Sequence, residues 1–257
     1  MKKQYIAVID SGIGGISALT ELDKTLSGEN FLYLGDNDNA PYGTRTKDDL
    51  LGITVNNIEY LKGLGELKAI VLGCNTLSVG LLDKIRYYCE PIPVFGVFPP
   101  VETAALSGKK SLLLATPLTA EKYTCEKKRG VSVIGLPRLA KTIEEHAFGL
   151  ESVAADGEID EAMFLAGLEK DNRAGAFENI ILGCTHYSFI KNKISDHFKP
   201  KRILNGVEYT AKTAAAVLKT KKSSVNNCRN SVLFVGKNSE LNRLFYEKVV
   251  KRQEKFK

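Results

Sequence analysis

Two cysteines in the sequence close nearly identical strand-like segments. Cys74 ends the sequence AIVLGC and Cys184 ends the sequence NIILGC, so the two thiols occupy equivalent places. The similarity continues without a gap through residues 69–106 and 179–216, which indicates a duplicated half-molecule rather than a short-period array. The alternative is that two strand–helix units converged on similar sequences. If the halves face each other, the thiols lie on opposite sides of one cleft at the carboxyl ends of strands.

The residues near each thiol favour proton transfer to or from sulfur. His186 stands close after Cys184, and a neutral imidazole can accept a thiol proton. Cys74 precedes a helix that we expect to start near Ser78, and a helix N-terminus depresses the pKa of a thiol. The alternatives are a buried structural cysteine and a histidine of the core.

Two opposed thiols can invert a stereocentre. One thiolate removes a proton from carbon, and the thiol on the other face returns one, with no cofactor. No lysine-centred pyridoxal motif is evident, so we expect no cofactor. Cys74, Cys184 and His186 are possible zinc ligands, but no closely spaced pair supports a preformed site, and we expect no metal.

A glycine-rich turn follows the first predicted strand. The segment 9–17 reads IDSGIGGIS, in which Ser17 breaks the dinucleotide-binding pattern, and no phosphate-loop Lys follows. Glycines of this kind let the backbone approach a ligand, and amides at a helix start attract anions. Asp10 either caps the following helix or points its carboxylate into the cleft.

The predicted elements alternate between strands and helices. Residues 50–64 have helical periodicity, and the short apolar runs suit strands buried on both faces. The sequence therefore predicts an α/β fold with mainly parallel sheets. The predicted strands are 5–9, 31–34, 69–72, 94–97, 111–115, 131–134, 179–182, 202–204 and 231–235.

Composition narrows the class of protein. The 257 residues are 44% hydrophobic and 26% charged, as in ordinary globular proteins. No apolar run is long enough for a transmembrane helix and no secretory signal is present, so we expect a cytoplasmic protein without membrane association. The net charge of +6 permits an anionic ligand, but no basic stripe with aromatics indicates nucleic-acid binding. The five cysteines are widely spaced and show no disulfide framework.

Several motifs together resemble those of the glutamate racemases, within the aspartate/glutamate racemase family. They occur in the family's order and span nearly the whole chain. The motifs are Asp10-Ser11-Gly12-x-Gly14-Gly15, Pro41-Tyr42-Gly43, Cys74-Asn75-Thr76, Thr116 with Thr119, and Gly183-Cys184-Thr185-His186-Tyr187.

The resemblance implies a fold and an activity. The fold would be two pseudo-symmetric α/β domains with the active site in the cleft between them, which we expect at residues 1–97 plus 208–257 and at 98–207. The activity would be cofactor-independent interconversion of L- and D-glutamate, supplying D-glutamate for peptidoglycan synthesis. The family resemblance also implies a homodimer. Because the chain starts at the first motif, we expect no control by a peptidoglycan precursor through an N-terminal extension.

The resemblance also assigns roles to individual residues. Cys74 would act at the D-enantiomer with Asp10, and Cys184 would act at the L-enantiomer with His186. Glu144 matches a further assisting acid. The residues that would hold the substrate carboxylates and amine are Ser11, Tyr42, Gly43, Asn75, Thr76, Thr116, Thr119 and Thr185.

The chain departs from the family pattern in places. Gly96-Val97-Phe98-Pro99-Pro100 and Gly135-Leu136-Pro137 replace the usual sequences, residues 119–135 are shortened, and residues 144–184 are lengthened. A related racemase acting on aspartate or another amino acid is therefore one alternative. A binding protein that kept the fold and lost turnover is the other.

Overall fold

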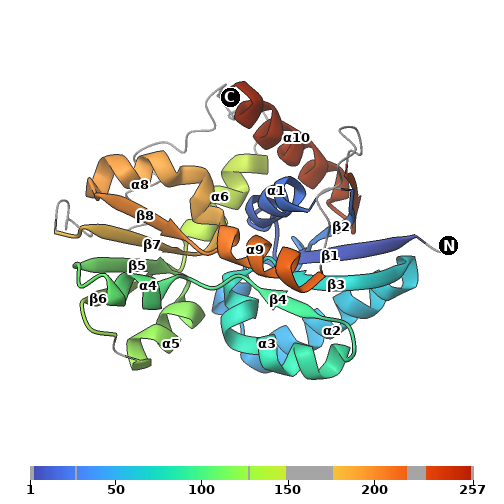
Figure 1. Ribbon diagram of the computed structural model, residues 1–257, viewed down its shortest axis with the longest axis horizontal. Helices are drawn as coiled ribbons and strands as arrows, with labels where there is room; N and C mark the ends of the chain where they lie inside the picture. Colours follow the sequence, from blue (N-terminus) through green and yellow to red (C-terminus); the bar gives the residue numbers. More distant parts are fainter. Residues whose placement is uncertain (1–2, 27, 127, 149–175, 219–229, 256–257) are drawn as a thin grey trace.

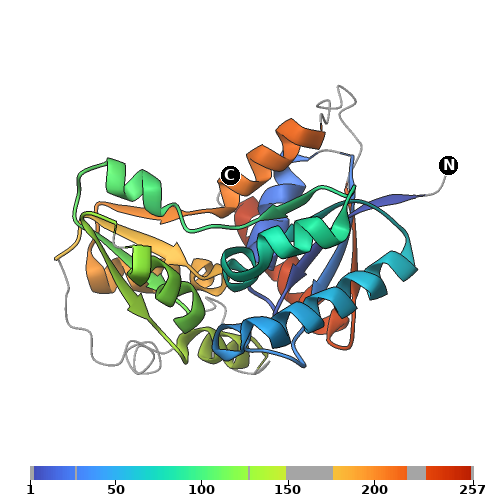
Figure 2. The same ribbon diagram turned by 90° about the horizontal axis from the view of Figure 1, so that it is seen from below.

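The structure is a computed structural model that describes residues 3–26, 28–126, 128–148, 176–218 and 230–255. Two parallel β-sheets, each with helices on both faces, lie side by side in these ranges (Figures 1 and 2). Within the same ranges, no helix has the length and apolar character needed to span a membrane.

The first sheet has five parallel strands in the order β4-β3-β1-β2-β9. The second has four parallel strands in the order β6-β5-β7-β8. The strands are β1 (Gln4–Asp10), β2 (Asn30–Gly35), β3 (Glu66–Leu72), β4 (Val94–Gly96), β5 (Ser111–Ala115), β6 (Val131–Gly135), β7 (Asn179–Gly183), β8 (Arg202–Asn205) and β9 (Ser231–Val235).

Every predicted strand is confirmed, and the α/β class with it. The two sheets also share one strand order, because β4-β3-β1-β2 matches β8-β7-β5-β6 when β1 corresponds to β5. Both predicted repeat segments thus begin in equivalent strands, β3 and β7. The duplication read from the sequence therefore has a structural counterpart, to which the first sheet adds β9.

Helices cover both faces of each sheet (Figure 1). In β1, Ile6 and Val8 pack in one core cluster with helix α1, whereas Ala7 and Ile9 pack on the opposite face with α2 and α3. This two-sided burial explains the continuous apolar runs. The helices are α1 (Ile16–Thr25), α2 (Lys47–Leu64), α3 (Asn75–Cys89), α4 (Val101–Leu106), α5 (Pro117–Glu126), α6 (Leu139–Phe148), α8 (Lys191–Phe198), α9 (Val207–Leu218) and α10 (Ser239–Lys255), with 3-10 helices η1 (Tyr42–Thr44) and η2 (Thr185–Ile190).

Two helices start earlier than predicted. The expected helix at residues 50–64 begins at Lys47, because the Thr46 hydroxyl caps it by accepting the Asp49 N–H at 3.2 Å. Helix α3 begins at Asn75 rather than near Ser78. Ser78 lies within this helix, and its hydroxyl donates back to the Cys74 carbonyl oxygen at 2.9 Å.

The helices that follow β4 and β8 cross between the sheets. Helix α4 contacts β5, β6 and β7 of the second sheet, whereas α9 packs against α1 beside the first. Helix α10 then packs against α1, β2 and β9. The C-terminal segment thereby returns to the first sheet, which brings α10 to the strand ends.

Candidate active site

The carboxyl ends of strands from both sheets surround one cavity of about 340 Å³. Ser11 follows β1, Cys74 follows β3, Thr116 follows β5 and Cys184 follows β7, and all four line the cavity. Both predicted thiols therefore reach one space from equivalent positions of the two halves. The cavity lies where α/β sheets commonly bind ligands.

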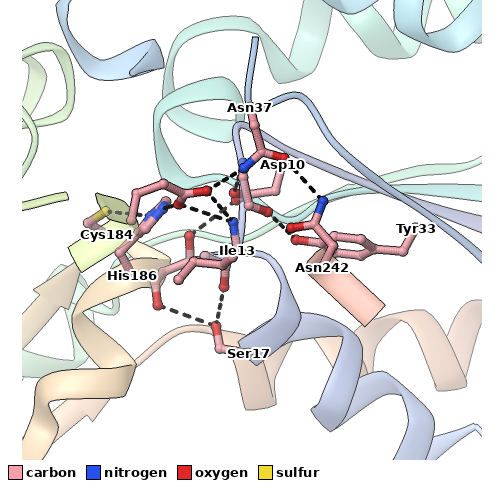
Figure 3. Close-up of polar contacts among 12 residues, drawn as sticks. Asp10, Ile13, Ser17, Tyr33, Asn37, Cys184, His186 and Asn242 are labelled. Carbon is pink, nitrogen blue, oxygen red and sulfur yellow. Dashed lines mark hydrogen bonds and ion pairs between the residues drawn. The ribbon is translucent and has the colours of Figure 1, made fainter. Parts of the chain in front are cut away.

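Cys184 is part of a hydrogen-bonded series of three side chains. It is the N-cap residue of η2, which places its Sγ atom 3.6 Å from Nδ1 of His186. The opposite ring nitrogen, Nε2, lies 2.6 Å from Oε2 of Glu144 on α6 (Figure 3). This arrangement of thiol, imidazole and carboxylate is suited to moving a proton on and off sulfur.

The partners of His186 determine its pKa. Burial by itself lowers the pKa of this imidazole, but the hydrogen bonds to Cys184 and Glu144 outweigh burial and raise the pKa well above its ordinary value. An imidazolium donates from both nitrogens, to the sulfur and to the carboxylate. The surroundings therefore favour a proton on His186, whose Nδ1 atom faces the Cys184 sulfur.

Glu144 is held by groups from several elements. Besides His186, its carboxylate accepts the backbone N–H of Ile13, at 3.1 Å to each oxygen, and a hydrogen bond from the Asn37 amide (Figure 3). The carboxylate passes so close to Gly12 that a Cβ atom there would lie 2.2 Å from Oε1. A glycine at position 12 is therefore what allows the acid to reach the turn after β1.

Cys74 has a different environment. It is the N-cap residue of α3, and amides of Leu77 and Thr76 lower its pKa as expected of a helix start. Burial and the nearby Asp10 carboxylate outweigh them, so the pKa of Cys74 is raised rather than depressed. The prediction of a depressed pKa was therefore wrong. Cys74 rests as a protonated thiol, the form that can donate a proton.

Asp10 is completely buried behind the cavity wall. It is not the cap of α1, whose N-cap residue is Gly15 and has no side-chain cap hydrogen bond. Its carboxylate instead accepts the Gly12 N–H at 2.9 Å and the Thr185 hydroxyl at 3.2 Å. Burial raises the pKa of Asp10, against the opposing effects of His186 and the Gly12 amide.

Hydroxyl groups from both halves meet at the cavity wall. The Oγ1 atoms of Thr76, from α3, and Thr116, after β5, lie 3.0 Å apart. Thr116 also donates to the Thr119 hydroxyl at 3.3 Å. The hydroxyl of Thr76 or Thr116 can rotate to donate to an oxygen of a bound carboxylate.

The predicted residues divide into those that line the cavity and those behind it. The lining ones are Ser11, Tyr42, Gly43, Cys74, Thr76, Thr116, Glu144, Cys184 and His186. The buried ones behind the wall are Asp10, Asn75, Thr119 and Thr185. Two of the predicted ligands already use their polar groups, because the Asn75 amide donates to the Val97 carbonyl at 2.9 Å and the Tyr42 hydroxyl donates to Asp36.

Sequence reasoning missed two amides beside the cavity. Asn37 follows β2, and Asn242 lies on α10 and donates to the Asn37 side-chain oxygen at 3.1 Å. The position of Asn37 after a strand end was a signal for it, but nothing in the neighbouring sequence distinguishes Asn242.

One of the departures from the family pattern lies at the cavity. In the segment 135–137, Leu136 is buried in the core and Pro137 lines the cavity. Most of the lengthened stretch, and Cys228, lie outside the described residues.

Comparison with known proteins identifies relatives over most of the chain. The model of the Asp/Glu/Hydantoin racemase family matches residues 8–214. A glutamate racemase of Clostridium acetobutylicum is 34% identical over 221 residues, covering 82% of each chain. A glutamate racemase of Leptospira interrogans is 30% identical over 258 residues, covering 98% of this chain and 93% of the relative.

Solved structures agree with these relatives. The glutamate racemase of Thermus thermophilus, solved with beta-chloro-D-alanine, superposes with a TM-score of 0.72 at 29% identity, over 96% of this chain and 93% of that one. The enzyme of Francisella tularensis, solved with D-glutamate, gives a TM-score of 0.68 at 26% identity, over 95% and 94%. The family match and the shared fold both cover the strands that carry the two thiols. The chain belongs to the Asp/Glu/Hydantoin racemase family.

Proposed function

We propose that this protein interconverts L- and D-glutamate without a cofactor, by proton transfer at two cysteines. The observation that carries the proposal is that Cys74 and Cys184, one from each sheet, line the same cavity. Inversion at carbon needs a base on one face of the substrate and an acid on the other. Two thiols from opposing halves meet that requirement.

Cys184 acts as the base in one direction. His186 takes the thiol proton at Nδ1 and is stabilised as an imidazolium by Glu144 at Nε2. The Cys184 thiolate then removes the Cα proton from the enantiomer whose C–H bond faces it. By resemblance to the family this is L-glutamate.

Cys74 acts as the acid in the same direction. Its raised pKa keeps the sulfur protonated, so it can deliver a proton to the opposite face of the carbanion. The turnover leaves Cys184 as a thiol and Cys74 as a thiolate, the pair required to run the reaction backwards. Asp10 is the carboxylate near Cys74 that can assist this exchange.

The hydroxyl side of the cavity would hold the substrate carboxylates. Thr76 and Thr116 lie on the wall with Ser11, so donors from both halves face the space. Hydrogen bonds to the α-carboxylate also stabilise the carbanionic transition state. The names of the relatives support glutamate as the amino acid.

The biological setting follows from this activity. D-glutamate produced by the enzyme would supply peptidoglycan synthesis in the cytoplasm. A homodimer is the expected assembly, which light scattering of the purified protein tests.

The two domains would be residues 1–97 plus 208–257 and residues 98–207. The packing of α9 against α1, and of α4 against the second sheet, supports this division.

Proton NMR in D₂O tests the activity directly. L-glutamate incubated with the protein in reducing buffer, without added cofactor, should lose its Cα proton signal while its optical rotation decays. Cys74→Ser and Cys184→Ser should each reduce racemisation by about 10³-fold or more, because a serine hydroxyl is a far weaker acid. Turnover of aspartate but not glutamate would favour the related racemase. Failure with every amino acid by folded protein would favour a binding protein and refute the proposal.

A further inference from the structure

A line of side chains leads from the C-terminal helix to the candidate base. Asn242 of α10 donates to Asn37, Asn37 donates to Glu144, and Glu144 accepts from His186, which contacts Cys184 (Figure 3). The members come from α10, the loop after β2, α6 and η2 with its N-cap residue, so the contacts that involve Asn37 and Glu144 join parts of the chain that are far apart in sequence.

The carboxylate of Glu144 determines which groups in this series of hydrogen bonds donate and which accept. An ionised carboxylate only accepts hydrogen bonds, so Asn37 must turn its NH₂ group toward Glu144 and its oxygen toward Asn242. Asn242 must then present its own NH₂ group. Any residue at position 242 without a donor would leave the Asn37 oxygen without this hydrogen bond and so remove one of the two contacts that orient the Asn37 amide.

Asn242 is a polar residue at a position that packing alone would fill with an apolar one. It is completely buried on the inner face of α10, and its Oδ1 atom has no hydrogen-bond partner among the described residues. A buried unsatisfied polar atom destabilises a fold, so an apolar side chain would suit packing alone better. Gly35 makes room for the amide, because a Cβ atom there would lie 2.6 Å from the Asn242 Nδ2 atom.

We propose that Asn37 and Asn242 are positioning residues that hold the Glu144 carboxylate against His186, so that the C-terminal helix orients the proton-transfer group behind Cys184. The proposal rests on the proposed function of His186 as the partner of that thiol. In this proposal neither amide acts on the substrate, because Asn242 is not among the residues that line the cavity and the Asn37 side chain, which does line it, is engaged by Glu144 and Asn242. The titratable groups that face His186 are Cys184, Glu144 and Asp10.

The pKa of His186, measured by NMR titration of histidine Hε1 signals, tests the proposal without requiring turnover. The chain has three histidines, so His146→Gln and His197→Gln suffice to assign the signals. In Asn37→Leu and in Asn242→Leu, Glu144 keeps the Ile13 amide but is held less firmly against His186, and the pKa of His186 should fall by about one unit. The double variant should match Asn37→Leu alone, because Asn242 acts through Asn37.

A matched variant separates positioning from stability. Asn230 ties the same C-terminal segment to Asp23 and Leu26, away from the cavity. Asn230→Ala should lower the melting temperature but leave the pKa of His186 unchanged. An unchanged pKa in Asn37→Leu would overturn the proposal, and an unchanged pKa in Asn242→Leu alone would overturn the link to α10.

Kinetics supply a second readout. In both Leu variants kcat should fall about 10-fold while KM stays within about two-fold, because the amides orient a proton-transfer group and do not hold substrate. A rise in KM at constant kcat would contradict a positioning role. Absence of turnover in the parent protein would refute the proposed function and leave the NMR test of the positioning residues intact.

Discussion

His186 Nε2 lies 2.6 Å from Glu144 Oε2, and these two residues come from different elements, η2 and α6. The contact leaves Nδ1 facing Cys184. Because Glu144 also accepts the Ile13 amide from the turn after β1, the acid joins the second half of the molecule to the first at the cavity. The proposed proton transfer at Cys184 would therefore depend on how the two halves meet.

Replacing Glu144 tests this dependence. Glu144→Gln keeps the shape of the side chain but removes the charge that holds a proton on His186, so the pKa of His186 should fall. We expect kcat to fall by about 10- to 100-fold, as when a group that orients a catalytic histidine is lost. Histidine NMR and steady-state kinetics measure the two effects.

Glu145→Gln is the matched control. Glu145 neighbours Glu144 on α6 and also lines the cavity, but its ion pair is with Lys141 at 3.5 Å, whereas that of His186 is with Glu144. Its replacement should leave the pKa of His186 unchanged. Equal shifts in both variants would mean that general charge near the cavity, and not the contact at Nε2, sets the pKa.

The close approach at Gly12 gives a second prediction. A methyl group in Gly12→Ala would collide with the Glu144 carboxylate and displace it from Ile13 and His186. Activity should fall by about 10-fold or more, with the far-UV circular dichroism unchanged. Full activity in Gly12→Ala would show that the position of Glu144 is not needed.

A glycine with open surroundings provides the comparison. Gly52 lies inside α2 with nothing within 4 Å of an added Cβ atom. Gly52→Ala should raise the free energy of unfolding by about 0.5–1 kcal/mol through helix propensity, with activity unchanged. Urea denaturation monitored by circular dichroism measures this gain.

Much of the fold could be predicted because its strands are buried on both faces. Runs such as residues 69–72 and 180–182 are apolar throughout, and their repetition led to Cys74 and Cys184 as equivalent positions. The cavity confirms that both thiols reach one space. Local pattern and internal repetition were sufficient for these features.

The supporting residues were harder to predict because they act across long stretches of chain. Asn37 lies in a loop rich in turn formers, and its partner Asn242 is remote in sequence on α10. The pKa of Cys74 was wrongly predicted for a related reason. Its neighbours in sequence indicate a helix start, whereas burial, which raises the pKa, depends on the tertiary fold.

The buried Asp10 carboxylate predicts a pH-dependent cost in stability. Because its folded-state pKa is raised above the unfolded value, ionised Asp10 destabilises the fold above the ordinary pKa of about 4. Asp10→Asn should therefore have a higher melting temperature than the parent protein near pH 7. The difference in melting temperature should disappear as the pH falls below about 4, where Asp10 of the parent protein is protonated in both states. Calorimetry at several pH values measures the difference, and an advantage independent of pH would contradict the assignment to ionisation.

The hydroxyl pair of Thr76 and Thr116 predicts where substrate binding is lost. Thr116→Val keeps the shape of the side chain but removes a donor to a bound carboxylate, and hydrogen bonds to charged groups contribute about 1.5–3 kcal/mol. We expect KM for glutamate to rise by about 10- to 100-fold while the pKa of His186 is unchanged.

Thr54→Val is the matched control. It removes a buried hydroxyl that donates to the Leu50 carbonyl within α2, and Thr54 is not among the residues that line the cavity, so KM should not change. An unchanged KM in Thr116→Val would place the substrate carboxylates elsewhere in the cavity, where Ser11 is the next donor on the wall.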